Sequence, residues 1–320
     1  MITLEDFAEV PARARGGYVA VGNFDGVHRG HAHLLGRLRA RAEAAGASAI
    51  ALTFDPPPVA VLRPEAAPAP LTWIDRRADL MVGAGAGEVG VFRTGPWLLG
   101  LSAREFFERV ILGQFAARGV VEGPTFGFGR DRGGDAQLLG SWCEGAGLDF
   151  EIVSPSESGD RIVSSSRIRQ ALAEGEAAEA AEMLGRPHRI RGVVTHGAGR
   201  GTGIGFATAN LDEIDTLIPA DGVYAVRAFV EGSSTPWPAA CNIGPNPTFG
   251  EQVRKVEAHL IDFRGDLYGQ TVELDILERI RPTRRFAGLD DLLAQIALDV
   301  ERAREIGSLG PGRARGSVAE

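Results

Sequence analysis

Lysine is almost absent from this chain of 320 residues, since Lys255 is the single example. A phosphate-binding P-loop needs a lysine after its glycines, and no such sequence occurs. Nearly all basic charge is therefore arginine, a bias for which genome composition is the simplest explanation. If the protein handles nucleotides, their phosphates must be held by arginine, histidine, backbone N–H groups, hydroxyls or a metal.

Cysteine, clustered basic residues and long apolar runs are also scarce. Cys143 and Cys241 lie far apart and form no metal or redox spacing, which suits a reducing cytoplasm. The net charge is -8 without a basic tail or stripe, so we expect no nucleic-acid partner. The start MITLEDFAEV lacks the features of a signal peptide, and no stretch approaches ~18 consecutive apolar residues. We therefore expect a cytoplasmic protein without membrane spans.

Strand and helix signals alternate over the first half of the chain. Residues 18–21 form a short apolar run that predicts a strand, and residues 29–45 carry apolar side chains on one helical face. This alternation predicts an α/β domain with a mainly parallel, doubly wound sheet. The other expected elements are strands at 50–54, 89–92 and from Val120 and Phe150, and helices near 74–83 and after the capping residue Ser102.

The pattern changes near residue 186, where helical signals give way to a series of short strands. Such a series, interrupted by Gly and Pro, predicts a small antiparallel β-barrel. We expect domains at 1–185 and 186–308, with an unstructured tail at 309–320. The expected barrel strands lie near 190–194, 222–230, 238–243, 255–263 and 271–280, before a last helix at about 289–305.

The segment GNFDGVHRGH, residues 22–31, follows the first strand and opens the first helix. Ligands of open parallel sheets bind beyond the carboxyl ends of the strands, where a helix N-terminus offers free N–H groups. His28 and His31 are three residues apart, so both imidazoles can donate hydrogen bonds to a triphosphate. The alternatives are surface histidines on a glycine turn, or a metal site of His28, His31 and His33 that lacks carboxylate or thiolate partners.

This segment resembles the signature of the HxGH nucleotidyltransferases, and specifically of the bacterial FMN adenylyltransferase module. VSSSRIR, residues 163–169, resembles the second motif of that superfamily. The resemblance implies that FMN phosphate attacks the α-phosphate of ATP with Mg²⁺ present, and that His28 and His31 are catalytic. The residues implied to bind ATP are Gly22, Asn23, Phe24, Asp25, Gly26, His28, His31, Ser164, Ser165 and Arg169.

Two segments depart from the pattern of the FMN adenylyltransferases. Pro57 replaces the histidine of the TF(D/E)PHP motif, and Thr125 takes the polar position of G-x-(D/N)-F-x-F-G. Both segments are thought to face the flavin in that family, so adenylylation is the activity that these changes affect. The residues implied to contact flavin here are Asp55, Thr125, Phe126 and Phe128.

The second half carries a glycine-rich run, residues 197–205, directly before FATAN. FATAN, residues 206–210, resembles the FPTAN motif of riboflavin kinases, which implies that Thr208 and Asn210 coordinate Mg²⁺-ATP. The same resemblance implies that Gly201, Gly203 and Gly205 lie against ATP. Taken alone, the glycine run is equally compatible with a flexible hairpin.

Further matches to riboflavin kinases follow in order at residues 217–224, 242–249 and 256–263. Strand alternation puts Glu257 on the face opposite Val256 and Ala258. A carboxylate there can accept the proton of the riboflavin 5′-hydroxyl, and its motif position favours this role over a plain surface carboxylate. Arg281 resembles a residue of the family's closing segment near the flavin.

The resemblance extends over about residues 15–305 and implies an ATP-dependent bifunctional enzyme that converts riboflavin to FMN and FMN to FAD. A riboflavin kinase with weak or absent adenylyl transfer is one alternative. A flavin-binding regulatory or storage protein without catalysis is another, although the retained motif residues argue against it. A nucleotidyltransferase for a different substrate would leave the second half unexplained. No oligomeric state follows from the motifs.

Overall fold

The computed structural model describes residues 1–158, 161–196, 206–233, 235–245 and 253–308. The chain divides into two compact units, Met1–Pro68 with Thr72–Ser165, and Ala69–Leu71 with Ser166–Glu320. The domain boundary expected near 186 falls inside the second unit. Helices α7 (Ser165–Glu174) and α8 (Ala177–Leu184) precede that position, and Ala177 belongs to the core of the barrel described below.

The first unit is built on a parallel sheet, which confirms the predicted fold class. All neighbouring strands of this sheet pair in parallel. The edge strand β1 was not predicted, because three residues are too few to show alternation. The strand order is β1 (Ile2–Leu4), β4 (Glu88–Arg93), β3 (Ala49–Asp55), β2 (Tyr18–Val21), β5 (Gly119–Glu122) and β8 (Asp149–Ile152).

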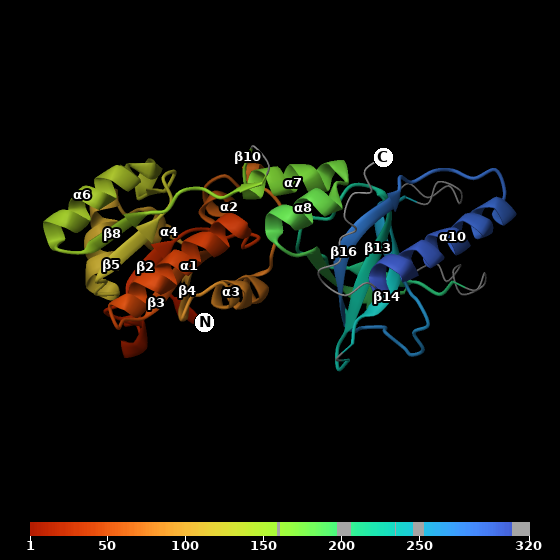
Figure 1. The fold of residues 1–320 in the computed structure, drawn as a ribbon, viewed down its shortest axis with the longest axis horizontal. Helices are drawn as coiled ribbons and strands as arrows, with labels where there is room; N and C mark the ends of the chain where they lie inside the picture. Colours follow the sequence, from red (N-terminus) through yellow and green to blue (C-terminus); the bar gives the residue numbers. More distant parts are fainter. Residues whose placement is uncertain (159–160, 197–205, 234, 246–252, 309–320) are drawn as a thin grey trace. The chain divides into compact units, whose positions relative to one another are not determined.

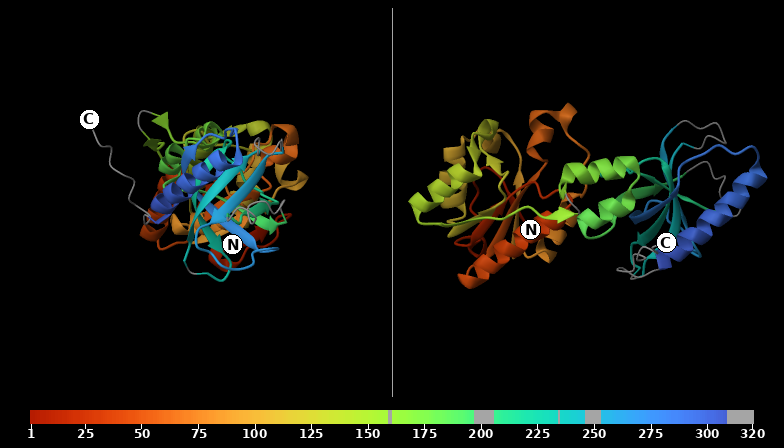
Figure 2. Two further views of the ribbon diagram at one scale, coloured as in Figure 1. Left: turned by 90° about the vertical axis from the view of Figure 1, so that its right-hand side faces the viewer. Right: turned by 45° about the horizontal axis from the view of Figure 1, so that its top comes forward.

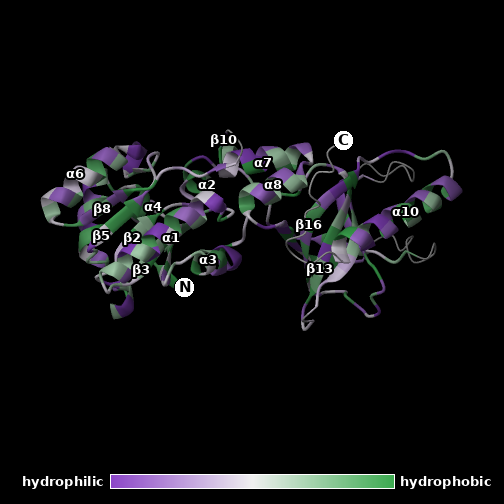
Figure 3. Cartoon of the chain, in the orientation of Figure 1, coloured by the Kyte–Doolittle hydropathy of each residue, from purple (hydrophilic) through white to green (hydrophobic). Residues whose placement is uncertain are grey.

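Helices cover both faces of this sheet, as a doubly wound fold requires (Figure 1). On one face, α1 (Arg29–Ala44) and α3 (Ile74–Gly83) bury Leu38 and Met81 against the strands. On the other face, α6 (Ala136–Ala146) and the π-helix η3 (Phe106–Gln114) bury Leu139 and Phe107. In Figure 3 the central strands are mostly green, while the helices that cover them carry purple on one side.

Ser102 caps a helix, as predicted. Its Oγ accepts from the Glu105 N–H at 3.2 Å, and the Glu105 carboxylate accepts from the Ser102 N–H at 2.8 Å. This capping box begins α5 (Ala103–Glu105), which continues directly into η3. The π-helical hydrogen bonding was not predictable, because the apolar spacing of this segment also fits an α-helix.

Short elements complete the first unit. They are η1 (Ala12–Ala14), α2 (Pro58–Leu62), η2 (Pro64–Ala66), α4 (Pro96–Leu99), β6 (Gly127–Phe128), η4 (Arg130–Arg132), β7 (Gly134–Asp135), β9 (Glu157–Ser158) and β10 (Arg161–Ile162).

The second unit contains a closed antiparallel barrel, which confirms the prediction for this half of the chain (Figure 2). Tyr224, Cys241 and Ala258 are fully buried in its interior. The strand β12 was missed, because its four residues show too little alternation. Around the barrel the order is β11 (His188–Thr195), β12 (Ala209–Asp212), β15 (Lys255–Leu260), β14 (Trp237–Gly244), β13 (Gly222–Val230) and β16 (Thr271–Arg281).

The last helix, α10 (Leu289–Ser308), packs against the outside of the barrel (Figure 1). Val300 and Ala303 of this helix form a small core with Ala225 and Ile261. Ile296 packs against the same core, so this side of the helix faces the strands. No helix in the described ranges is long and apolar enough to cross a membrane.

Candidate functional site

The loop after β2 lies where the order of the parallel sheet reverses. β2 pairs with β3 on one side and with β5 on the other, so the chain leaves β2 at the switch point of the sheet. A crevice at the carboxyl ends of the strands is the usual ligand site of such sheets. The predicted GNFDGVHRGH segment occupies this position.

The two histidines of this segment lie together at the start of α1. His28 is the N-cap, is 6% exposed, and accepts the N–H of His31 at its Nδ1 at 3.3 Å. The two rings stack with centroids 3.6 Å apart, and Phe24 meets the His31 ring edge-on at 5.2 Å. Because both rings are held by packing, they offer a fixed pair of imidazoles at a helix N-terminus.

The backbone of the loop is unusual, and Gly30 shows why the motif needs a glycine. Phe24 and Val27 have φ of 46° and 38°, a region that costs a non-glycine residue of order 1–3 kcal/mol. A Cβ at position 30 would lie 3.2 Å from two ring atoms of His28. A larger residue there would force the His28 ring to shift by a few tenths of an ångström.

Asp25 is buried beneath the loop and anchors it to α3. Its Oδ1 accepts from the Thr72 N–H at 3.1 Å, from the Thr72 hydroxyl at 3.2 Å and from Arg77 Nη2 at 3.3 Å. Asp25 is 7% exposed and Arg77 4%. The Thr72 Oγ1 also accepts from the Gly26 N–H at 3.2 Å. Thr72 and Arg77 were missed by sequence reasoning, because no motif links them to a loop about fifty residues earlier.

The second nucleotidyltransferase motif meets the first at Ser165. The Ser165 hydroxyl donates to the Asp25 carbonyl at 2.9 Å, and the Asn23 carbonyl accepts from the Thr53 hydroxyl at 3.0 Å. Of the residues predicted to bind ATP, the structure brings together the loop from Gly22 to His31 and Ser165. Arg169 lies on α7 in the second unit, where its Nε donates to the Ala69 carbonyl at 2.9 Å.

The segments predicted to face flavin follow β3 and β5 at the same edge of the sheet. Asp55 ends β3, and Phe126 stacks on Phe128 with ring centroids 5.3 Å apart. Phe128 is 7% exposed and packs into the core of the unit, so its role includes support for this edge. The Thr125 carbonyl accepts from Arg132 at 3.2 Å, which holds the turn closed.

On the barrel, strand register aligns the predicted kinase residues in one row. Asn210 of β12 pairs with Glu257 of β15, which pairs with Asn242 of β14. The row continues through Val223 of β13 to Arg281 of β16. Directly opposite residues lie about 4.5–5.5 Å apart at Cβ, so the two amides flank the carboxylate. Asn242 opens the matched segment 242–249, but no role was predicted for it, because only the register places it beside Glu257.

The FATAN segment presents its polar side chains outward beside this row. Ala209 faces the barrel core, so Asn210, the next residue of β12, faces the outer side. Thr208 directly precedes the strand and is exposed. The Ala207 carbonyl lies 2.8 Å from His259 Nδ1, which ties the segment to the strand that carries Glu257. Gly201, Gly203 and Gly205, predicted to lie against ATP, are outside the described residues.

Arg281 at the end of the row is held by an ion pair, and Cys241 beneath the row is fully buried. Arg281 donates to Asp299 of α10 through Nε and Nη2, at 2.7 Å for the shortest contact, so its head group is fixed rather than extended. Cys241 lies inside the barrel under the row. Burial, reinforced by the charge of Glu257, raises the pKa of the Cys241 thiol and keeps it protonated.

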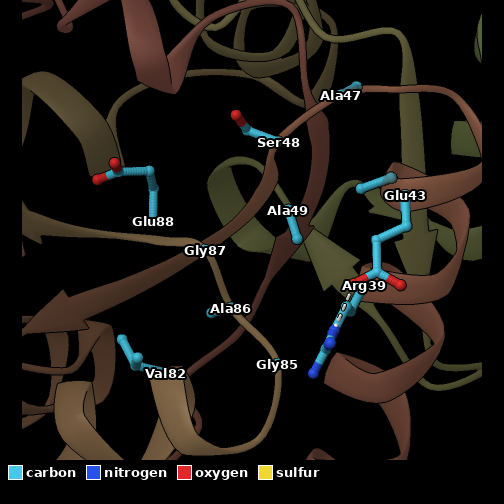
Figure 4. A pocket seen from close by; sticks show the side chains of 11 residues that line it. Arg39, Glu43, Ala47, Ser48, Ala49, Val82, Gly85, Ala86, Gly87 and Glu88 are labelled. Atoms are coloured by element: carbon cyan, nitrogen blue, oxygen red, sulfur yellow. Dashed lines mark hydrogen bonds and ion pairs between the residues drawn. The ribbon is translucent and has the colours of Figure 1, made fainter.

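A hollow of about 370 Å³ lies at the opposite edge of the parallel sheet (Figure 4). Ser48, Ala49 and Glu88 line it at the beginnings of β3 and β4, with Arg39 and Glu43 paired across from them. This is the edge away from the histidine loop, so the hollow is not the predicted site. Within the described ranges, no group of three or more His, Cys, Asp or Glu is arranged to hold a metal.

Family models match both halves of the chain. Residues 10–167 match the model described as FAD synthetase, and residues 184–307 match the one described as riboflavin kinase. Together with the two units, these matches define a two-module flavin-nucleotide enzyme.

The chain belongs to the bifunctional riboflavin kinase/FMN adenylyltransferase family. It is 37% identical to the member from Pseudomonas fluorescens over 293 residues, which cover 91% of this chain and 93% of that protein. It is 36% identical to the member from Escherichia coli K12, covering 92% and 94%, and 34% identical to the one from Bacillus subtilis, covering 89% and 90%.

A solved structure shares the fold. A crystal structure described as a macrolide-efflux protein from Streptococcus pneumoniae matches with a TM-score of 0.83 and 30% identity. The match covers 95% of this chain and 99% of that one, so it includes both the parallel sheet and the barrel.

Arg77→Leu tests the buried anchor of the histidine loop. Removing one partner of a buried ion pair leaves an uncompensated charge, so the free energy of opening of the first unit should fall by about 3–5 kcal/mol. Amide hydrogen exchange in β2 and α3 measures this unit separately. The control is Arg13→Leu, because the Arg13 side chain that pairs with Glu88 is 63% exposed, so this variant should lose less than about 1 kcal/mol. Equal losses for both variants would contradict the anchoring role.

Proposed function

We propose that this chain phosphorylates riboflavin to FMN on the barrel unit and adenylylates FMN to FAD on the parallel-sheet unit, using ATP each time. The observation that carries the proposal is the presence of two separate polar sites. One is the stacked His28–His31 pair at a helix N-terminus, and the other is the row of Asn210, Glu257 and Asn242 on the barrel. Each suits a different phosphoryl reaction.

Adenylylation needs alignment and charge stabilisation more than a base. An oxygen of the FMN phosphate bonds to the α-phosphorus of ATP, the bond to the bridging oxygen breaks, and pyrophosphate leaves. The nucleophile is already an anion, so no proton has to be removed. We assign His28 and His31 to hydrogen bonding with the phosphates, and the free N–H groups of α1 to the same charge. Ser165, bonded to the Asp25 carbonyl, would support the loop from behind.

Phosphorylation of riboflavin needs a base, because its nucleophile is a neutral hydroxyl. We assign this role to Glu257, which would accept the 5′-hydroxyl proton as the oxygen bonds to the γ-phosphorus and ADP leaves. Asn210 and Asn242 lie on the two neighbouring strands, directly opposite Glu257. Their amides can restrict the carboxylate to one orientation while leaving it charged.

Magnesium fits the donor atoms of the FATAN segment. Thr208, an exposed residue directly before β12, and Asn210 of that strand supply a hydroxyl and an amide oxygen near the Glu257 carboxylate. Hard oxygen donors of this kind, with phosphate oxygens, are what Mg²⁺ prefers. When bound, Mg²⁺ would offset negative charge on the phosphates. We assign Thr208 and Asn210 to holding it and Glu257 to the substrate hydroxyl.

A product assay distinguishes this proposal from its alternatives. Purified protein is given riboflavin, ATP and Mg²⁺, and FMN and FAD are separated by chromatography. Formation of both products supports the proposal. FMN without FAD would identify a kinase whose adenylyl transfer is impaired by Pro57 or Thr125. Flavin binding without ATP turnover would identify a non-catalytic protein.

The proposed activities also imply a cell location and a set of binding partners. We propose a cytoplasmic enzyme whose partners are riboflavin, FMN and ATP. Cys143 and Cys241 are both free and buried in the described structure, as suits a reducing environment.

Glu257→Gln should remove the base of the kinase while keeping the size of the side chain. We expect the rate of FMN formation to fall by about 10²–10⁴-fold, because general base catalysis contributes that much. FAD formation from added FMN should stay at the original rate and is the internal control for folding. A kinase rate that stays unchanged would remove Glu257 from its assigned role.

His28→Ala combined with His31→Ala should abolish the second reaction selectively. We expect FAD formation to fall by at least about 10²-fold, because donors aimed at developing charge are lost. FMN formation should persist. The matched control is His33→Ala, an exposed histidine two residues along the same helix. Loss of FMN synthesis in the double variant would contradict the separation of the two sites.

Thr208→Ala should weaken the response of the kinase to magnesium. We expect a higher Mg²⁺ concentration for half-maximal FMN formation, because one oxygen donor is lost. The Mg²⁺ dependence of FAD formation from FMN, measured on the same preparation, should not move. If both dependences shift together, or neither does, the assignment of Thr208 is wrong.

A further inference from the structure

Glu122 is a buried carboxyl group that the assignments above leave unused. It is the last residue of β5 and is 2% exposed. Within the described part of the chain, no basic side chain forms an ion pair with it. A buried acid without a cation must find its hydrogen bonds elsewhere. The position of its partners shows what the residue does.

The first partner is the end of β2. The N–H of Gly22 donates to the Leu52 carbonyl of β3, and the N–H of Tyr18 donates to the Ser48 carbonyl directly before that strand. Since successive N–H groups in a strand point to opposite sides, the N–H of Val21 points toward β5. The Glu122 Oε1 accepts this N–H at 2.6 Å. The side chain therefore stands where a regular ladder would supply a backbone carbonyl.

The pairing of the two strands ends just before this contact. β2 and β5 are in register at Tyr18 with Gly119 and at Val19 with Val120, and the register does not extend to Val21. The strands separate beyond that point, at the switch point of the sheet. The carboxyl group of Glu122 bridges the separation.

Glu122 also fixes the beginning of the next loop. Its main-chain carbonyl accepts from the Val153 N–H at 2.8 Å, and Gly123 follows it directly in the chain. Val21 directly precedes the loop 22–28 that carries His28, and Gly123 opens the segment 123–129. One residue thus joins the bases of two loops that the sequence predicts to contact ATP and flavin.

We propose that Glu122 is a positioning residue for adenylyl transfer, which sets the distance between the histidine loop and the segment 123–129 at the carboxyl edge of the sheet. The inference rests on the assignment of adenylylation to the parallel-sheet unit. Alignment to within about 1 Å matters here, since misplacement of that size can cost about 10²-fold in rate. Glu122 itself touches no reacting atom.

The charge state of Glu122 suits this position. Burial raises the pKa of its carboxyl well above the usual range, and the Val21 N–H offsets this in part. Burial therefore favours the neutral acid. A neutral group can lie beneath the site of a triphosphate without repelling it. Glutamine is a neutral side chain of nearly the same shape, and its Oε1 can accept the Val21 N–H.

The test compares Glu122→Met with Glu122→Gln in the full chain. Methionine keeps the buried volume but accepts no comparable hydrogen bond, so FAD formation from FMN should fall by about 10²-fold per folded molecule. Glutamine should keep at least about a third of the original rate, because the bond to Val21 is retained. Glu144→Met, an exposed glutamate of α6, is the matched control. Hydrogen exchange in β2 gives the folded fraction of the unit.

The outcomes separate this inference from the proposed function. Original rates in Glu122→Met per folded molecule would overturn it, and so would an equal loss in the methionine and glutamine variants. If Glu122→Met does not fold, the glutamine variant decides: a rate below a tenth of the original rejects the inference. The unaltered chain is run alongside. If it forms no FAD at all, the proposed function itself has failed.

Discussion

The histidine loop depends on the burial of one carboxylate beneath it. Asp25 holds Thr72 and Arg77 in an environment from which water is nearly excluded, so each partner is needed to offset the cost of desolvating the charge. With this anchor in place, Phe24 and Val27 can keep a backbone conformation that would otherwise relax. The loop therefore keeps a strained backbone conformation that presents the two imidazoles. The surrounding helix and sheet stabilise this conformation.

The barrel positions its polar side chains in a different way. Its three central polar residues are brought together by strand register, and the one buried ion pair described at the site holds Arg281 at the far end of the row. Asn210, Glu257 and Asn242 come from three strands and share one row because the ladder fixes them there. A shift of one residue in any of these strands would turn its side chain into the core. Closure of the barrel removes the free edges that could permit such a shift.

Much of this architecture could be predicted from the chain alone, and the exceptions have physical causes. Apolar runs indicated the strands, and apolar residues at helical spacing indicated the helices. The sheet, the barrel and α10 were therefore predicted. β1 and β12 are too short to show such a run, and the π-helix shares its spacing with an α-helix. His28 and Glu257 were found because motifs contain them. Arg77 lies in no motif, and Asn242 lies in one that gives it no role; the place of each at its site depends on contacts between distant parts of the sequence, so it required the folded structure.

The placement of α8 bears on how the protein can be divided. Ala177 is almost completely enclosed by side chains of the barrel, and Gly175 lies against Arg279. A gene fragment that starts at the visible change of pattern near residue 186 would omit this helix. It would leave an apolar patch of the barrel uncovered and open to aggregation. A self-sufficient kinase fragment must therefore begin upstream of Ala177, within what the motifs alone would assign to the other activity.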